Sequence, residues 1–222
     1  MGRKEWSVTI VFQDVFCTGF NRERTEFLLG NLRMEQRNFD HNERRVSYLG
    51  DDKMIYIYNC YGGTHSSALA AAYHLKKLPA NREPTDKEIL NIDVFNKLTS
   101  KDMGKLIFHG YDEEKNEVYT LGRGSSKVVV PAMYELANLL NKKGELQTKI
   151  LFSNTSPTVP LSMTLGGLFS RRLKINVIGV PLLIIGAKQA HKDIIKLVEQ
   201  TKNSAKVTTS KIEILDNVFG EV

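Results

Sequence analysis

The fold is decided by residues 54–75, which read MIYIYNCYGGTHSSALAAAYHL. The run at 54–59 is dense in β-branched and aromatic residues, as in a strand that is buried on both faces of a sheet. Small and polar residues follow, and an alanine-rich run of strong helix formers comes next. A buried strand that leads through glycine and serine into a helix is typical of the first unit of an α/β fold.

Strand-like and helix-like segments alternate downstream of this unit. We expect strands at residues 105–110, 117–121, 149–153, 175–178 and 182–185, and helices at 68–75, 127–141, 158–172 and 188–202. Thr85 and Glu88 have the spacing of a capping box, which predicts a further helix start. The alternation predicts a three-layer α/β domain, P-loop-like or Rossmann-like, with a mostly parallel sheet, helices on both faces and a β-hairpin.

The chain divides into three parts at the level of sequence. Residues 54–202 are expected to form the α/β domain, and residues 203–222 a polar C-terminal tail with one late strand. Residues 1–53 have no sustained hydrophobic period. The Gly50-Asp51 codons can read GGAGA, a ribosome-binding core just upstream of Met54. The hypothesis is that translation starts at Met54; the alternative is a genuine N-terminal extension.

Composition narrows the class of protein. The 222 residues carry a net charge of +6, all of it from residues 54–222 and without a run of five basic residues, which argues against nucleic-acid binding. Two cysteines exclude a disulfide-built scaffold. The longest apolar stretch, 175–187, is shorter than the roughly 20 residues of a membrane span. We therefore expect a cytoplasmic protein without membrane contact.

The loop after the first strand is the best candidate for a binding site. Gly62 and Gly63 allow a ligand to approach the backbone, and the N–H groups and dipole of the following helix favour an anion. Hydroxyl groups that could donate to the ligand come from Thr64, Ser66 and Ser67. The alternative is a tight turn with a structural role only.

Two known phosphate loops can be laid over this segment. Residues 61–67 align with the deviant Walker pattern, but both of its lysines are missing and His65 replaces a glycine. The cysteine-phosphatase pattern, Cys-x5-Arg-Ser/Thr, runs from Cys60 to Ser67, with Ser66 where the arginine belongs. The loop therefore lacks the lysines that ordinary ATP hydrolysis needs and the arginine that phosphatase chemistry needs.

Arg123 is the best substitute for that cation. It follows another strand end, in a turn that also holds Ser125. Asn154 and Thr155 follow the next strand. Because ligands of open α/β sheets bind beyond the carboxyl ends of the strands, these residues could form further walls of one site. For Arg123 the alternative is an exposed turn residue.

Cys60 and His65 form the most concrete catalytic hypothesis. A thiol beside a helix N-terminus can act as a nucleophile, and a histidine can activate it. The alternative is a small buried cysteine. A metal site is disfavoured, since no ligand spacing links this pair to His109 or His191. His74 is interpreted as a packing or surface residue, and the acidic residues 112–114 as a solvated hairpin tip.

Residues 58–67, 116–119 and 121–123 together resemble a bacterial family known as domain of unknown function 3189. The resemblance covers about residues 54–202. It implies the extent of the domain and no particular activity.

The sequence thus predicts a protein that binds a phosphate-bearing small molecule or a nucleotide at the loop after its first strand. One alternative is a non-catalytic regulatory or interaction protein with a degenerate phosphate loop. A second is a phosphoryl- or acyl-transfer enzyme that uses Cys60. No cofactor and no oligomeric state are indicated.

Overall fold

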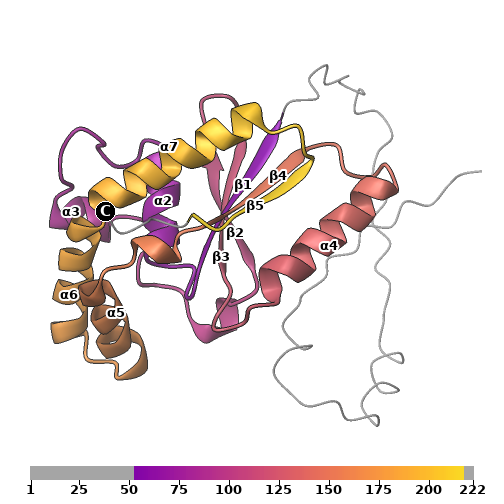
Figure 1. Ribbon diagram of the computed structural model, residues 1–222. Helices are drawn as coiled ribbons and strands as arrows, with labels where there is room; N and C mark the ends of the chain where they lie inside the picture. Colours follow the sequence, from indigo (N-terminus) through magenta and orange to yellow (C-terminus); the bar gives the residue numbers. More distant parts are fainter. Residues whose placement is uncertain (1–52, 218–222) are drawn as a thin grey trace, which may run out of the picture. The chain divides into compact units, whose positions relative to one another are not determined.

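The run at residues 54–60 forms β1, the central strand of a five-stranded sheet, in a computed structural model that describes residues 53–217. The strand order is β2-β3-β1-β4-β5 (Figure 1). β3 and β4 flank β1 in parallel, β5 lies parallel to β4, and β2 is antiparallel to β3. The strands are β1 Met54–Cys60, β2 Leu106–Tyr111, β3 Glu117–Gly122, β4 Lys149–Asn154 and β5 Ile212–Leu215.

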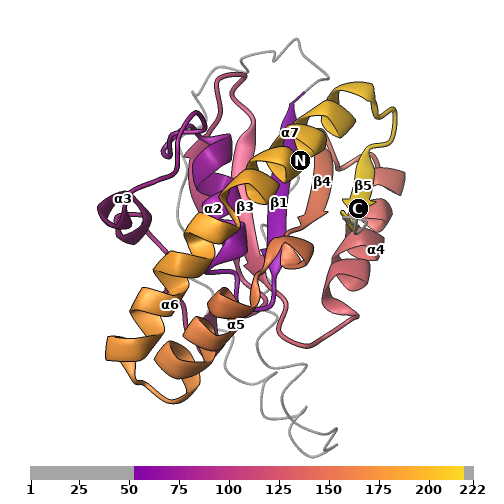
Figure 2. The same cartoon turned by 60° about the vertical axis from the view of Figure 1, so that its left-hand side comes forward.

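Helices cover both faces of the sheet (Figure 2). Because side chains alternate along a strand, Tyr56 and Tyr58 of β1 pack in one core with α2 and α7, whereas Ile57 packs in a second core with α4. The helices are α2 Ser66–His74, α3 Asp86–Leu90, α4 Val129–Lys142, α5 Leu161–Gly167, α6 Asn176–Gln189 and α7 His191–Val207. Shorter turns are the 3-10 helices η3 Ser100–Asp102 and η4 Ser156–Thr158 and the π-helix η5 Leu168–Arg172.

Most of the expected elements are confirmed. The first strand, the hairpin of β2 and β3, and β4 lie where the sequence placed them. Thr85 and Glu88 form the capping box at the start of α3. Pro131 is accommodated in the first turn of α4, where its missing N–H costs no hydrogen bond. The mostly parallel sheet with helices on both faces is therefore the architecture of the chain from residue 53 to 217.

The strands expected at 175–178 and 182–185 are wrong: both runs lie in α6. Short apolar runs look alike in buried strands and buried helices. Glycines explain the packing, since an added Cβ at Gly179 would lie 2.5 Å from the Ser170 N and one at Gly186 would lie 2.6 Å from the Met163 N. α5 and α6 thus form a helical hairpin with backbones in close contact, and the last helix begins at His191.

The C-terminal stretch contributes to the fold. α7 continues to Val207, and β5 supplies the late strand at Ile212–Leu215. The start-site hypothesis concerns residues 1–53, which except for Lys53 lie outside the described residues.

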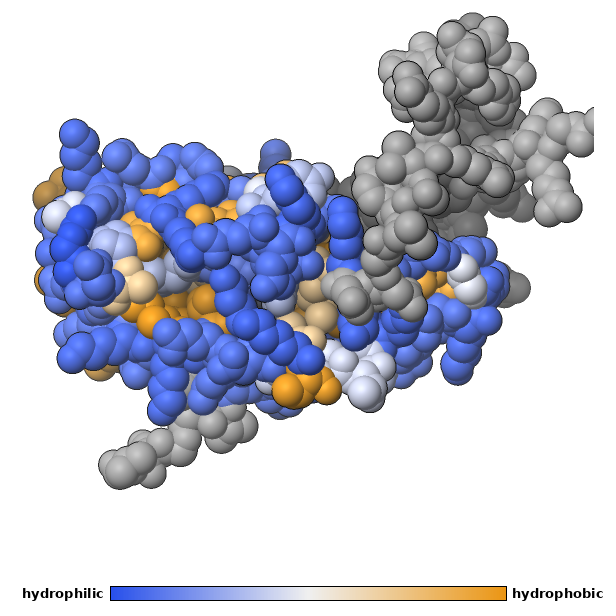
Figure 3. All heavy atoms as spheres, turned by 90° about the horizontal axis from the view of Figure 1, so that it is seen from above, coloured by the Kyte–Doolittle hydropathy of each residue, from blue (hydrophilic) through white to orange (hydrophobic). Residues whose placement is uncertain are grey.

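The described helices include none with the length and apolar character needed to cross a membrane. Hydrophilic side chains occupy most of the face seen in Figure 3, with smaller apolar areas between them.

Candidate functional site

The carboxyl ends of β3, β1 and β4 lie together at one edge of the sheet. Cys60 is level with Gly122, and Asn59 with Asn154. Backbone hydrogen bonds extend this alignment beyond the strands, because the Arg123 N–H donates to the Cys60 carbonyl at 3.0 Å and the Thr155 N–H to the Asn59 carbonyl at 2.8 Å. The three segments expected to form one site are therefore neighbours.

The glycines of the loop bring two backbones into contact. Gly63 has φ +67°, and a Cβ there would lie 2.6 Å from the backbone N of Gly122. A Cβ on Gly122 would in turn lie 2.8 Å from the carbonyl oxygen of Gly62. The sequence suggested that a ligand approaches the backbone of these glycines. At Gly63, the end of β3 makes this close approach.

The N-terminus of α2 is buried and has no side-chain cap. Ser66, Ser67 and Ala68 have 0 % exposure, and among residues 53–217 no acceptor is present for their backbone N–H groups. The first intrahelical bond is that of the Leu69 N–H to the His65 carbonyl, at 2.9 Å. A buried helix start without acceptors is unusual, because open N–H groups normally find a capping side chain, water or a ligand.

The side chain of Cys60 lies under this helix start. It is buried, its Sγ accepts from the Gly63 N–H at 3.2 Å, and it lies 3.2 Å from the Ser67 Oγ within a hydrogen bond. Ser67 is the serine that ends the cysteine-phosphatase pattern. The loop therefore brings the first and last residues of that pattern into contact.

The other hydroxyl groups of the candidate site hold the loops to one another. The Ser66 Oγ bonds the Thr155 Oγ1 at 2.9 Å, and Thr155 Oγ1 donates to the Asn59 carbonyl at 3.1 Å. Thr64 Oγ1 donates to the Val94 carbonyl and accepts from the Lys97 N–H at 3.2 Å. All three hydroxyl residues are fully buried, so their present partners belong to the protein.

The contacts of the His65 ring are with the segment at residues 95–96 and not with Cys60. Its Nε2 lies 3.3 Å from the Asn96 Oδ1, its ring packs edge-on against Phe95, and the described residues give it no hydrogen bond to Cys60. Burial lowers the pKa of His65 to about 4, and the positive charge of Arg171 acts in the same direction. The imidazole is neutral at neutral pH.

Arg123 reaches across the end of β1. Its backbone follows β3, and its Nη2 donates to the Oγ of Ser156, beyond β4, at 3.1 Å. The side chain is partly buried, and no carboxylate within the described range pairs with it. Ser125 lies exposed on the following turn, and the Asn154 Oδ1 accepts from the Ser156 N–H at 3.0 Å. Arg123 is thus a cation at this edge that has no carboxylate partner in residues 53–217.

A second polar cluster, at the amino edge of the sheet, escaped the sequence reasoning. The ring of His74 joins the Tyr58 hydroxyl at 2.7 Å to the Asp112 Oδ2 at 3.1 Å. The Asp112 side chain is 7 % exposed and also accepts from Asn116, so the expectation that residue 112 is solvated is wrong. Long separations in sequence hid this cluster, because Tyr58, His74 and Asp112 come from different elements.

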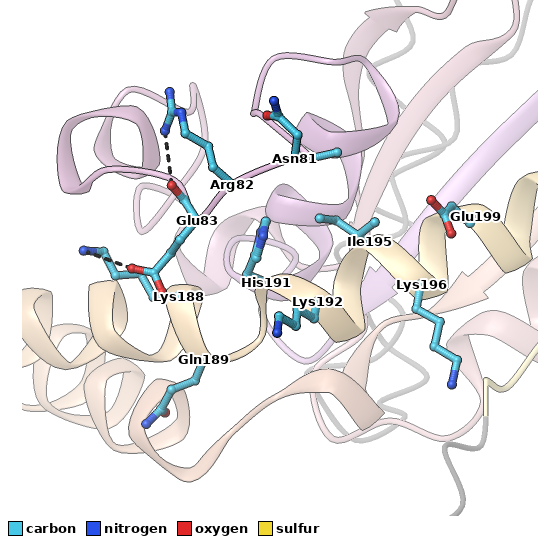
Figure 4. A pocket seen from close by; sticks show the side chains of 11 residues that line it. Asn81, Arg82, Glu83, Lys188, Gln189, His191, Lys192, Ile195, Lys196 and Glu199 are labelled. Atoms are coloured by element: carbon cyan, nitrogen blue, oxygen red, sulfur yellow. Dashed lines mark hydrogen bonds and ion pairs between the residues drawn. The ribbon is translucent and has the colours of Figure 1, made fainter.

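A cavity of about 630 Å³ lies elsewhere, between residues 80–83 and α7 (Figure 4). An ion pair of Glu83 with Lys188 borders it. The ring of His191 and the side chain of Lys196 point away from α7 in opposite directions in Figure 4. No group of three or more His, Cys, Asp or Glu side chains in residues 53–217 is arranged to hold a metal ion. The candidate residues of the carboxyl edge are not part of this cavity.

Comparison with known proteins identifies the family. A family model described as "Protein of unknown function (DUF3189)" matches residues 55–203, and the chain belongs to this family. No curated protein and no solved structure gives a significant match.

Proposed function

We propose that this member of the DUF3189 family binds a phosphate-bearing small molecule or a nucleotide at the carboxyl edge of its sheet. The observation that carries the proposal is the buried start of α2, whose N–H groups at Ser66, Ser67 and Ala68 have no acceptor among the described residues. Several such N–H groups, together with the positive end of the helix dipole, form a binding site for an anion.

Arg123 supplies the charge that the loop lacks. Its guanidinium already extends over the end of β1 to Ser156 and has no carboxylate partner in the described part of the chain. A guanidinium binds phosphate oxygens in a bidentate manner, so this arginine takes the place of the missing Walker lysines. The hydroxyls of Ser66, Ser67 and Thr155 set the shape of the loop, and the backbone donates to the ligand.

A second candidate function is phosphoryl transfer through Cys60. It is favoured by the Gly63 N–H, which donates to the sulfur, and by the Ser67 Oγ, which shares a hydrogen bond with it. The Sγ thiolate would form an S–P bond while the ester P–O bond breaks, and the leaving alkoxide would take a proton from water. Water would then hydrolyse the S–P bond to release inorganic phosphate and the thiol. The non-catalytic regulatory protein is the alternative in which neither step occurs.

A thermal-shift titration of the full chain tests the binding. Inorganic phosphate, a nucleoside diphosphate and a sugar phosphate are compared, because a ligand at 100 times its Kd stabilises a fold by about 2.7 kcal/mol. We expect at least one to raise the Tm of the wild type. Arg123→Ala weakens binding about tenfold or more, as expected for a lost charge-assisted hydrogen bond.

Arg172→Ala is the matched control, since Arg172 is exposed and lies outside the site. It should retain the full shift. Absence of a shift with all three anions in the wild type would exclude the proposed function.

Alkylation by iodoacetamide separates the enzyme from the binding protein. If Cys60 is the nucleophile, its alkylation abolishes turnover of an aryl phosphate, and bound inorganic phosphate protects it. A wild-type protein that binds phosphate yet never releases phosphate from the ester supports the non-catalytic alternative.

A further inference from the structure

The helical hairpin of α5, η5 and α6 exposes an unusual share of apolar side chains. It spans residues 161–189, yet it holds 8 of the 16 large apolar residues that are exposed within residues 53–217. Val177 is 88 % exposed, Leu161 at the start of α5 is 73 % exposed, and Leu173 in the turn is 53 % exposed. Single apolar residues are normal on a surface, whereas a concentration of this kind marks an interaction site.

α6 is apolar around its whole circumference. It contains no polar side chain from residue 177 to residue 187. Gly179 and Gly186 close the side that meets η5 and α5, whereas Val177 and Ile185 remain exposed. The two helices pack mainly against each other and lie beside the sheet (Figures 1 and 2). Because a helix that is apolar all round normally lies in a core or in lipid, we expect a further apolar partner.

The turn of the hairpin is cationic. Arg171 and Arg172 end η5, Lys174 follows, and none of the three forms an ion pair in the described part of the chain. The exposed Leu173 lies between two of these cations. No Asp or Glu occurs from residue 155 to residue 192. The hairpin therefore combines apolar and positive groups and has no carboxylate that would repel an anionic surface.

We propose that the α5–α6 hairpin is a docking surface for an anionic lipid membrane. Its exposed aliphatic side chains enter the boundary between headgroups and acyl chains, and the cations of the turn contact lipid phosphates. A second copy of the chain fits this surface less well, because it would bring like charges together. A nucleic acid fits less well too, since the exposed large apolar residues of the hairpin are aliphatic and offer no ring for a base to stack on.

The sequence led to the expectation of no membrane contact, because the longest apolar stretch is shorter than the roughly 20 residues of a spanning segment. A hairpin that lies in the membrane interface needs no such segment. Membrane docking is also separate from phosphate binding at the start of α2, because different residues carry the two.

Flotation of the full chain with lipid vesicles tests the proposal. The wild type should bind vesicles that contain phosphatidylglycerol roughly tenfold more tightly than vesicles of phosphatidylcholine alone, and added salt should weaken the binding. Arg172→Glu combined with Lys174→Glu should abolish this preference. The matched control combines Lys142→Glu with Lys143→Glu at the end of α4, outside the hairpin, and should keep it.

Val177→Gln should weaken binding to the anionic vesicles about tenfold, as expected when one aliphatic side chain no longer leaves water. Val207→Gln is its control, because Val207 is 80 % exposed and lies at the end of α7. Equal binding of the wild type to both kinds of vesicle, no binding to either, or unchanged binding in the hairpin variants would overturn the proposal. A wild type that ignores vesicles and forms a dimer, which Val177→Gln dissociates, would assign the hairpin to a second copy instead.

Discussion

At its carboxyl edge the sheet brings the open N–H groups of α2 close to Arg123, whereas at its amino edge the last residue of α2, His74, is bonded on both ring nitrogens. Both regions are buried and polar. In one, each group has its partner in the protein: Tyr58, Asp112 and, at the backbone of His74, Lys202. In the other, the backbone N–H groups at the start of α2 have no acceptor among residues 53–217, and Arg123 has no carboxylate partner there. The comparison separates a polar cluster whose partners lie within the protein from the edge at which we propose that a ligand binds.

Acidification is expected to give the largest effect, because each edge contains a histidine whose pKa is lowered by desolvation. The pKa values of His65 and His74 are both lowered to about 4, mainly by burial. Since the unfolded chain binds these protons near pH 6.5, the free energy of unfolding falls as the pH drops from 6.5 toward 4, by ~3 kcal/mol for each histidine.

Urea denaturation between pH 7 and pH 4 measures this loss. His74→Leu should remove the contribution of the amino edge to the pH dependence of the free energy of unfolding. A stability that is constant over this range would show that the two rings are not buried as neutral groups.

Gly63→Ala should be the most damaging single change at the carboxyl edge. Strain from the positive φ costs about 1–2 kcal/mol, and the backbone of Gly122 at 2.6 Å cannot move aside easily. We expect a total of ~3 kcal/mol by urea denaturation. Gly144→Ala is the control, because Gly144 has φ +72° and open space around it. If both variants lose the same free energy of unfolding, the contact of Gly63 with Gly122 does not contribute to stability.

His74→Leu should destabilise the amino edge by ~2 kcal/mol, since the Tyr58 hydroxyl and Asp112 lose their shared partner. Binding of inorganic phosphate should be unchanged. Adding Tyr58→Phe should restore part of the stability, because a buried hydroxyl without a partner is then removed. A weaker phosphate affinity in His74→Leu would contradict the division of the molecule into two independent edges.

The elements that position the site could be predicted from local sequence. The buried run at β1, the capping box at Thr85 and the turn after β3 each depend on nearby residues. The α5–α6 hairpin could not, because a run of apolar residues has the same composition in a strand and in a helix; the glycine contacts that decide it involve residues far apart in the chain.

The sequence predicted that the candidate residues lie together at one edge of the sheet, and it predicted their contacts only in part. Strand order brings Arg123 and Ser156 together, as expected for the carboxyl edge. The bonding of Thr64 to the segment at 94–97 and of His65 to Asn96 depends on tertiary contacts that periodicity does not encode.

The most direct test of the central claim is an NMR titration of the ¹⁵N-labelled full chain with inorganic phosphate. The account predicts that the backbone amide signals of Ser66, Ser67 and Ala68 shift with one saturable Kd, and that those of Tyr73 and His74 at the other end of α2 do not. If the amides of the helix start remain unchanged at saturating phosphate, or if the saturable shifts are confined to residues around the cavity of α7, the carboxyl edge is not the anion site.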